Sequence, residues 1–309
     1  MQVLLKKLTR ELVMLLLFFL PRERKTAVER WLRGREDFRK LQQADCVVVS
    51  FGKSGRTWVR VMMSRVYQLK HGLSERHMLS FDNLHHKHPA IPKVFFTHDN
   101  YLRDYTGHHH HKRDYAGRKV VLLVRHPADV AVSQFFQWKY RMRPVKQRIN
   151  DYPEGEVDIR DFVLGDKAGL PKIIHWMNLW AEALRELDQV LVVRYEDLRK
   201  DPGGELARIM EFIGTPAEAT EIRGAVEYAA YENMKKLEER NVFWWNRRLR
   251  AGNRGNPDSF KVRRAKVGGY RDYFEGEALV QVESRIREQL VPGFGYETEL
   301  DNPRPAVNA

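Results

Sequence analysis

The 309-residue chain contains a single cysteine, Cys46, which excludes an intramolecular disulfide and suits a reducing compartment. Cys46 begins an apolar run, so we expect a buried structural thiol rather than a reactive one. No internal repeat and no linker rich in Pro, Gly or Ser divides the chain. A chain of this length buries roughly three quarters of its unfolded surface. The composition, with 43% hydrophobic and 11% aromatic residues, therefore predicts a well-cored globular protein.

The chain has no apolar run long enough to make a membrane span obvious. Leu12–Leu20 is apolar throughout but short, since a spanning helix needs about 20 residues. No cleavage site of the Ala-x-Ala kind follows it, which disfavours a signal peptide. Basic residues flank it on both sides, as in a helix that lies in a membrane interface. The alternative is a helix buried against the domain or against a second subunit.

Acidic residues are fewer than basic ones, with 41 Asp and Glu against 54 Lys and Arg and a net charge of +13. Such an excess favours anionic partners: nucleotides, nucleic acid, an anionic membrane surface or acidic glycans. Charge alone does not choose among them.

A loop after the first β-branched run is typical of a phosphate or sulfate site. Residues 47–49 are three valines, and Gly52, Lys53, Ser54 and Gly55 follow before a helix-prone segment. Such a loop presents backbone N–H groups and a helix N-terminus to an anion, and the lysine adds a full charge. It is not a Walker A loop, because that motif needs a glycine where this chain has valine 47. An ordinary strand–turn–helix corner is the alternative.

The remaining pattern alternates strands with helices. We expect strands at 46–51, 93–97, 119–124 and 190–194, and helices at 22–43, 57–70, from 127, at 172–187 and at 202–212; residues 71–92 look irregular. This predicts an α/β three-layer sandwich with a central parallel β-sheet flanked by helices. Ligands of such sheets bind at the carboxyl ends of the strands. Lys53, His98, Arg125 and Tyr195 follow the four strands in turn, so we expect them to converge.

From about Cys46 to Phe274 the chain resembles the sulfotransferases that use 3′-phosphoadenosine 5′-phosphosulfate (PAPS), and we identify it as a suspected bacterial-type member. The family's loop Pro-Lys-Ser-Gly-Thr-Thr-Trp is similar to residues 52–58 here. The resemblance implies a P-loop-like nucleotide-binding topology. It also implies that the 5′-phosphate and sulfuryl group are held by Lys53, Ser54, Gly55, Arg56 and Thr57, with Trp58 stacked on the adenine.

Other segments resemble the family's remaining cofactor motifs. Residues 125–133 are similar to Arg-Asn-Pro-x-Asp-x-x-x-Ser, which implies that Arg125 and Ser133 bind the 3′-phosphate. The resemblance also implies that Tyr195, in Tyr-Glu-Asp-Leu, lies near the adenine with Tyr231 on its other side. Residues 263–270 are similar to Arg-Lys-Gly-x-x-Gly-x-Trp, and this implies that Arg263 and Arg264 cover the 3′-phosphate.

The chain departs from the family pattern at several positions. Ala265 and Arg271 replace a glycine and a lysine of the last motif, and we expect the backbone contact at Ala265 to be lost unless its φ is negative. Phe96 stands where animal cytosolic members often have lysine, so a second lysine near the sulfuryl group is missing or comes from elsewhere. The C-terminal dimer motif of animal enzymes is not recognisable, so their dimer mode is not transferred.

Sulfuryl transfer needs a base, a cation at the leaving oxygen and fixed donors, by analogy with phosphoryl transfer. The resemblance and an ordinary pKa near neutrality make His98 the expected base, with its neighbour Asp99 as a second candidate. Lys53 is expected to stabilise the leaving phosphate. The resemblance also implies that Ser133 keeps Lys53 away from the sulfuryl group until an acceptor binds. We expect no metal requirement, and the run 108–111 of four histidines is interpreted as a flexible loop over the acceptor site.

Two other functions stay open. A P-loop nucleotide kinase would need an Asp for magnesium at a strand end, where this chain has Arg125. A non-catalytic, membrane-associated nucleotide-binding module would keep the fold without activity. We expect a hydroxyl acceptor, first a lipid or amphipathic alcohol, then a carbohydrate, then a small phenol. Two aromatic groups suggest an apolar acceptor pocket, Phe135-Phe136 and Phe243-Trp244-Trp245.

The sequence divides into three parts. Residues 1–43 form an apolar and basic helical segment for a membrane interface or an oligomer, 44–295 the sulfotransferase domain, and 296–309 a polar C-terminal tail. We expect acceptor loops within 71–92, 100–117, 140–170 and 240–260. We expect no nucleic-acid partner, allow a homo-oligomer, and predict a cytoplasmic protein that can lie peripherally on the inner face of a membrane.

Overall fold

A computed structural model of the chain describes residues 11–243, 249, 252–253 and 255–296. Its centre is a four-stranded sheet in the order β2-β1-β3-β4. The strands are β1 (Cys46–Ser50), β2 (Val94–Thr97), β3 (Lys119–Val124) and β4 (Val190–Arg194), and all pairs are parallel. The predicted parallel α/β sheet is therefore confirmed, with strand bounds that agree to within a residue or two.

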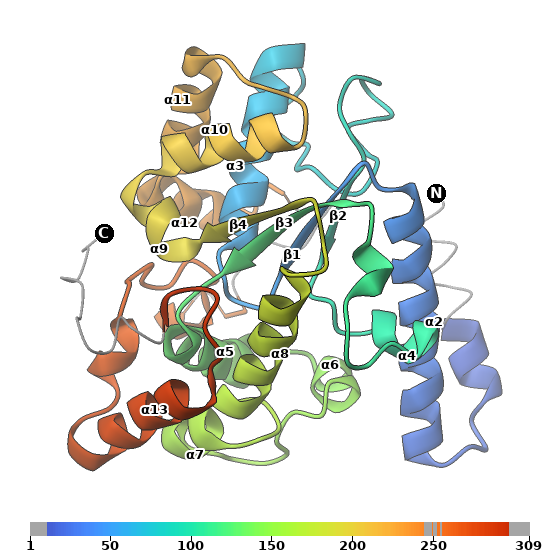
Figure 1. The fold of residues 1–309 in the computed structure, drawn as a ribbon, viewed down its shortest axis with the longest axis vertical. Helices are drawn as coiled ribbons and strands as arrows, with labels where there is room; N and C mark the ends of the chain where they lie inside the picture. Colours follow the sequence, from blue (N-terminus) through green and yellow to red (C-terminus); the bar gives the residue numbers. More distant parts are fainter. Residues whose placement is uncertain (1–10, 244–248, 250–251, 254, 297–309) are drawn as a thin grey trace.

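Helices cover both faces of the sheet, which gives three layers (Figure 1). Alternate residues of β1 show why: Val47 and Val49 belong to one apolar core and Val48 to another. The first core contains α5 (Pro127–Arg141), α8 (Leu170–Ala183) and α13 (Gly276–Gln289). The second core contains α3 (Arg56–His71), α10 (Pro202–Phe212) and α11 (Ala219–Tyr228).

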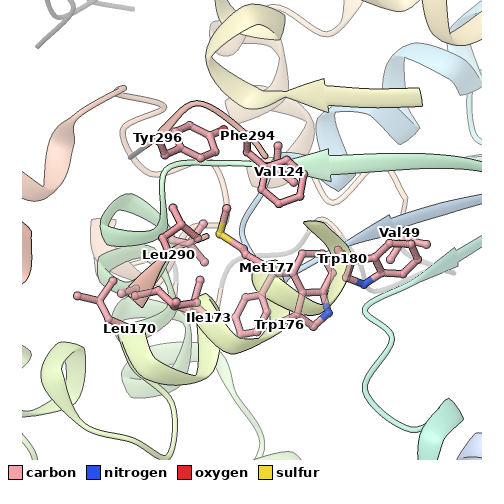
Figure 2. Close-up of a cluster of buried hydrophobic side chains, with 14 of the residues drawn as sticks. Val49, Val124, Leu170, Ile173, Trp176, Met177, Trp180, Leu290, Phe294 and Tyr296 are labelled. Carbon is pink, nitrogen blue, oxygen red and sulfur yellow. The ribbon is translucent and has the colours of Figure 1, made fainter. Parts of the chain in front are cut away.

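The helix α8 and the C-terminal segment close the first core together. Figure 2 shows Trp176, Met177 and Trp180 of α8 beside Val49 and Val124 of the sheet, with Leu290 and Phe294 from the end of the chain. Tyr296 is fully buried there and donates a hydrogen bond to Glu196 at 2.6 Å. The core thus extends one residue into the predicted polar tail, whose other residues, 297–309, lie outside the described part.

The helix α2 (Arg22–Gln43) packs against the elements around the sheet. It packs along α4 (Leu102–Thr106) and also contacts α6 (Pro144–Ile149). Arg30 forms two hydrogen bonds of 2.9 Å to the carboxylate of Asp104, and Leu41 is fully buried. Leu41 thus joins the first core and Phe38 packs against it, and the domain boundary predicted at 43/44 stays a prediction.

Short elements complete the chain: α7 (Ile159–Leu164), α9 (Tyr195–Lys200), α12 (Tyr231–Glu239) and the 3₁₀ turns Arg113–Tyr115, Pro257–Ser259 and Gly269–Asp272. The helix predicted at 172–187 begins at 170, because Pro171 is tolerated in a first turn, and ends at 183. Within the described ranges, no helix has both the length and the apolar character that crossing a membrane requires.

Candidate functional site

The carboxyl ends of the strands open onto a cavity of about 1140 Å³. Lys53, His98, Arg125 and Tyr195, one from the end of each strand, all line it. The other predicted site residues that line it are Gly55, Arg56, Thr57, Trp58, Ser133, Tyr231, Arg263 and Arg264. Ser54 does not line it and is buried. The structure thus brings together residues that lie more than 200 positions apart in the sequence.

The loop between β1 and α3 has the backbone of an anion cradle. Lys53 and Gly55 have φ of 74° and 87°, and α3 begins at the next residue, Arg56. A Cβ on Gly55 would lie 2.8 Å from Cδ2 of Tyr195, so only glycine fits. The first turn of α3 leaves backbone N–H groups for a ligand. Trp58 is held in place by a hydrogen bond from its Nε1 to the carbonyl of Ala229 at 2.8 Å.

Burial and like charges act on the ammonium group of Lys53. Loss of water, with Arg141 and Arg125 nearby, lowers the pKa of Lys53 to about 7. A lysine in this state gains its full positive charge when an anion enters. Lys53 is therefore suited to hold a phosphate or sulfate rather than to pair with a protein carboxylate.

Arg125 joins the phosphate loop to the C-terminal loop 266–270. Its guanidinium donates to the carbonyls of Lys53 at 3.2 Å and Lys266 at 3.0 Å, and it lies 4.3 Å from the ring centre of Tyr195. Asp129, one helical turn later, pairs with Arg125 at 3.4 Å. Because Asp129 also accepts the amides of residues 268 and 270 at 2.8 and 3.0 Å, it holds this loop against α5.

Ala265, in the loop 263–271, has a positive φ of 50°. The expectation that its backbone contact to the cofactor is lost therefore stays a prediction. The Asp129 clamp supports this left-handed residue, whose cost is about 1–2 kcal/mol. Arg263 lies 3.8 Å from the ring centre of Phe136, inside the cavity, whereas the more exposed Arg264 pairs with Asp272 at 2.5 Å.

His98 is held as a neutral imidazole. Its Nδ1 lies 2.8 Å from the carbonyl of Ser50 and so carries the hydrogen, which leaves Nε2 as an acceptor. A guanidinium nitrogen of Arg56 lies 2.6 Å from this Nε2. Loss of water and the charge of Arg56 hold the pKa of His98 well below its usual value. Both His98 and Arg56 line the cavity, and the guanidinium of Arg56, the first residue of α3, covers Nε2.

Asp99 is not available as a base. One carboxylate oxygen accepts a hydrogen bond from the ammonium of Lys112 at 2.6 Å, and the other accepts from the hydroxyl of Tyr115 at 2.9 Å. All three residues are buried. The structure therefore argues against the second candidate, because both carboxylate oxygens of Asp99 are already engaged in buried contacts.

Two buried charged residues at or beside the site were not predicted from the sequence. Arg60 is 3% exposed, stacks 3.8 Å from the ring centre of Phe96, and its Nη1 has no hydrogen-bond partner among the described residues. Its position one turn after Arg56 on a predicted helix was an available signal. Glu238, 1% exposed, pairs with Arg141 at 2.9 Å and accepts the backbone amide of Lys261 at 2.7 Å. Only the fold reveals the role of Glu238.

The cavity walls differ from the predicted acceptor loops. Segments 100–117, 140–170 and 240–260 contribute to the lining, but 71–92 does not, and α2 and α8 take its place. Of the aromatic groups expected around an acceptor, Phe136 lines the cavity, whereas Phe135 packs against Phe162 and Phe243 is buried in the second core. Tryptophans 244 and 245 lie outside the described residues.

The four histidines at 108–111 follow α4. Nδ1 of His108 lies 2.9 Å from the carboxylate of Asp114, and the rings of His108 and His111 are 4.5 Å apart. No group of three or more His, Cys, Asp or Glu side chains suited to a metal ion occurs in the described ranges. The histidines among the described residues that line the cavity are instead His98, which follows β2, and His175 of α8.

Comparison with known proteins decides the family. The sulfotransferase domain family matches residues 43–292. The chain belongs to the sulfotransferases. This overturns the alternative of a P-loop kinase. The sulfotransferase is 24% identical over 272 residues to Cytosolic sulfotransferase 12 of Arabidopsis thaliana, covering 83% of this chain and 80% of that one. It is 25% identical over 284 residues to Flavonol 3-sulfotransferase of Flaveria bidentis, covering 85% and 88%.

Solved structures share the fold of this sulfotransferase. Mouse sulfotransferase SULT7A1, complexed with PAP, superposes with a TM-score of 0.57 at 19% identity, covering 86% of this chain and 93% of that one. Retinol dehydratase, in a complex with retinol and PAP, superposes with a TM-score of 0.55 at 19% identity, covering 80% and 81%.

Proposed function

We propose that this sulfotransferase moves the sulfuryl group of PAPS to a hydroxyl acceptor, with His98 as the general base and Lys53 as the cation at the leaving phosphate. The observation that carries the proposal is the meeting of these two groups in one cavity, with Nε2 of the neutral His98 facing it. Two similar folds carry PAP, the product that PAPS leaves after transfer.

The residues present fit a bisphosphorylated nucleotide. Lys53 and Arg60 are cations that no carboxylate of the described residues pairs with, and Arg60 has an orphaned buried nitrogen. Arg125, Arg263, Tyr195 and Tyr231 line the same cavity, where the hydroxyl of Tyr231 donates to the carbonyl of Arg263 at 2.9 Å. A buried cation without a carboxylate is costly unless a ligand supplies the anion.

The transfer needs three actions from the protein. Nε2 of His98 takes the proton of the acceptor hydroxyl as its oxygen bonds to sulfur. The bond from sulfur to the bridging oxygen breaks, and that oxygen keeps the electron pair as the 5′-phosphate leaves. Lys53 stabilises this charge, and the amides at the start of α3 hold the sulfuryl oxygens.

Phe96 stands where animal cytosolic members often have a lysine near the sulfuryl group. In this protein Arg56 and Arg60 supply that positive charge. Because Arg56 covers Nε2 of His98, its guanidinium must move before an acceptor hydroxyl can reach the base. An incoming sulfuryl group offers Arg56 a better partner than a neutral imidazole. Steering of Lys53 by Ser133 stays a prediction: Ser133 lines the cavity, and no hydrogen bond joins the two side chains.

The decisive experiment uses calorimetric titration with PAP and a turnover assay with PAPS on wild type and His98→Asn. Asparagine keeps a donor for the Ser50 carbonyl but has no basic nitrogen. We expect PAP binding to persist and turnover to fall by about 10²–10⁴. If the wild-type protein does not bind PAP, the proposal is refuted. If turnover by His98→Asn equals that of the wild type, the role of His98 as the base is refuted. A non-catalytic module would show PAP binding and no turnover at all.

We also propose that the N-terminal apolar segment contacts a membrane surface. Leu12, Leu15, Leu16, Phe18 and Phe19 are all more than half exposed, and basic residues follow them. Co-sedimentation with anionic vesicles should be lost in Leu15→Asp/Phe18→Asp. Concentration-dependent dimerisation without vesicle binding would assign the segment to a second subunit instead.

A further inference from the structure

One side of the cavity carries many positive charges. Its wall comes from α2, the segment 100–112, α6 and α8, with α2 in contact with both α4 and α6 (Figure 1). The cationic residues of this wall are Arg30, Arg33, Arg103, Lys112, Arg143, Lys146 and Lys172. Its two carboxylates are Asp37 and Asp99.

Three of these cations are neutralised within the protein. Arg30 pairs with Asp104 at 2.9 Å and Arg33 with Glu29 at 2.7 Å. Lys112 pairs with Asp99 at 2.6 Å. These pairs fix the wall and leave no charge for a ligand.

The other four cations have no carboxylate within 4 Å among the described residues. They are Arg103, Arg143, Lys146 and Lys172, and we call them the cationic wall. Lys172 is oriented by two carbonyls, those of residues 150 and 167, each at 2.8 Å. Carbonyls position an ammonium group but do not cancel its charge. The remaining carboxylate of the wall, Asp37, contributes one negative charge against the four positive charges of the cationic wall.

These charges repel one another and the base. Loss of water, followed by the charges of Arg33, Arg56 and Arg143, lowers the pKa of Lys146. Loss of water and the nearby Arg30 and Arg103 lower the pKa of Lys172 to about 8, against the opposing effect of Asp151. Lys146 also contributes to the low pKa of His98. An anion bound at the wall would relieve this repulsion.

The same wall offers neutral hydrogen-bonding groups. Asn100, Tyr101, Asn150 and Tyr152 line it between the cations. Amide and phenol groups of this kind donate to and accept from hydroxyls. Trp176 of α8 and Leu179 supply a limited apolar surface, as a sugar ring needs. Such a lining suits a polyhydroxylated acid better than an alkyl chain.

We propose that the acceptor of this sulfotransferase is a sugar acid, with one hydroxyl at His98 and a carboxylate or sulfate bound by the cationic wall. This rests on the proposed function, which assigns the reaction to this cavity. The transfer step is the one given above, and the anionic group takes no part in bond making. It orients the acceptor and restores basicity to His98.

A matched pair of acceptors tests the proposal: 4-nitrophenyl β-glucuronide and 4-nitrophenyl β-glucoside, which differ in a carboxylate at C6. Binding of each to the PAP-loaded protein is measured by calorimetry, and sulfation from PAPS by PAP release. We expect the glucuronide to bind and react at least ten times better at low salt. The preference should shrink as ionic strength rises, because salt screens the wall.

Variants locate the effect. In Lys146→Gln/Arg103→Gln the preference for the acid should fall to about threefold or less. The control is Lys167→Gln, which removes one positive charge, against two in the double variant, at an exposed residue that pairs with Asp151 at 3.7 Å and is not part of the cavity lining. The control variant should prefer the glucuronide over the glucoside to the same extent as the wild type. A double variant that merely misfolds would lose both acceptors and PAP binding together.

The outcomes separate the two proposals. Equal use of both glycosides overturns the sugar-acid acceptor and leaves sulfuryl transfer standing. Acid-selective, Lys146-dependent binding without any sulfation supports the cationic wall and overturns the proposed function. Absence of selective binding overturns the wall. Sulfation of phosphatidylglycerol vesicles in preference to the glucuronide would assign the anion to a lipid and also overturn the sugar acid.

Discussion

The ammonium group of Lys53 makes cofactor affinity depend on pH in a predictable direction. The group has a pKa of about 7 in the protein, because it is buried beside Arg141 and Arg125. Two phosphate charges nearby should return the pKa to about 10, its ordinary range. Since the bound state then holds its proton more tightly, PAP binding takes up a proton. The affinity for PAP is therefore highest below pH 7, and it falls as the pH rises from 7 toward the pKa that Lys53 has in the bound state.

The magnitude follows from the size of this change. Each pH unit above 7 weakens binding about tenfold, so affinity at pH 9 should be about 100-fold lower than at pH 6. This corresponds to about 2.7 kcal/mol. Proton uptake should be about one half at pH 7 and close to one at pH 8. The second phosphate ionisation, near pH 6, does not contribute above pH 7.5.

Calorimetry in two buffers with different ionisation enthalpies measures the proton uptake directly. The control is Lys53→Arg, which keeps the positive charge but has no titration in this range. Its PAP affinity should be nearly constant between pH 7 and pH 9. Wild-type affinity that is equally constant, with heats independent of buffer, would refute the assigned state of Lys53.

Three further changes test other contacts. Arg56→Gln removes the charge beside His98, so the pKa of His98 rises and the acid limb of the pH–rate profile moves to higher pH; an unmoved limb would contradict the contact at Nε2. Asp129→Asn loses charge-assisted bonds to loop 266–270 and should weaken PAP binding about tenfold in calorimetry, and equal binding would show that the loop needs no clamp. Leu122→Ala should lower the free energy of unfolding in urea by about 2–5 kcal/mol, and a loss below 1 kcal/mol would deny a tightly packed sheet.

The elements around the sheet were predictable because their information is local. Runs such as Val120–Val124 are apolar at every position, which identifies a strand buried on both faces. The glycine and lysine after β1 mark a turn into a helix N-terminus, and a polar residue after each strand marks the edge where ligands bind. Local pattern therefore determined the sheet and the turn after β1, whereas the role of His98 as the base came from the family resemblance and stays a prediction.

Contacts between distant segments were decided by the tertiary structure. The sequence offered Asp99 as a base, and packing of the segment 112–115 engaged both of its oxygens. It set α2 apart from the domain, yet α2 packs along α4 and contributes Arg30, Arg33 and Asp37 to the cavity wall.

The cationic wall shows the same division. Its members come from α4, the start of α6 and α8, and nothing in the spacing of those segments relates them. Whether each lysine or arginine is neutralised depends on which carboxylate lies within a few ångströms, and that follows from packing alone. Periodicity and turn chemistry along the chain determine elements, whereas charge balance in a cavity is set by side chains that meet only after the chain has folded.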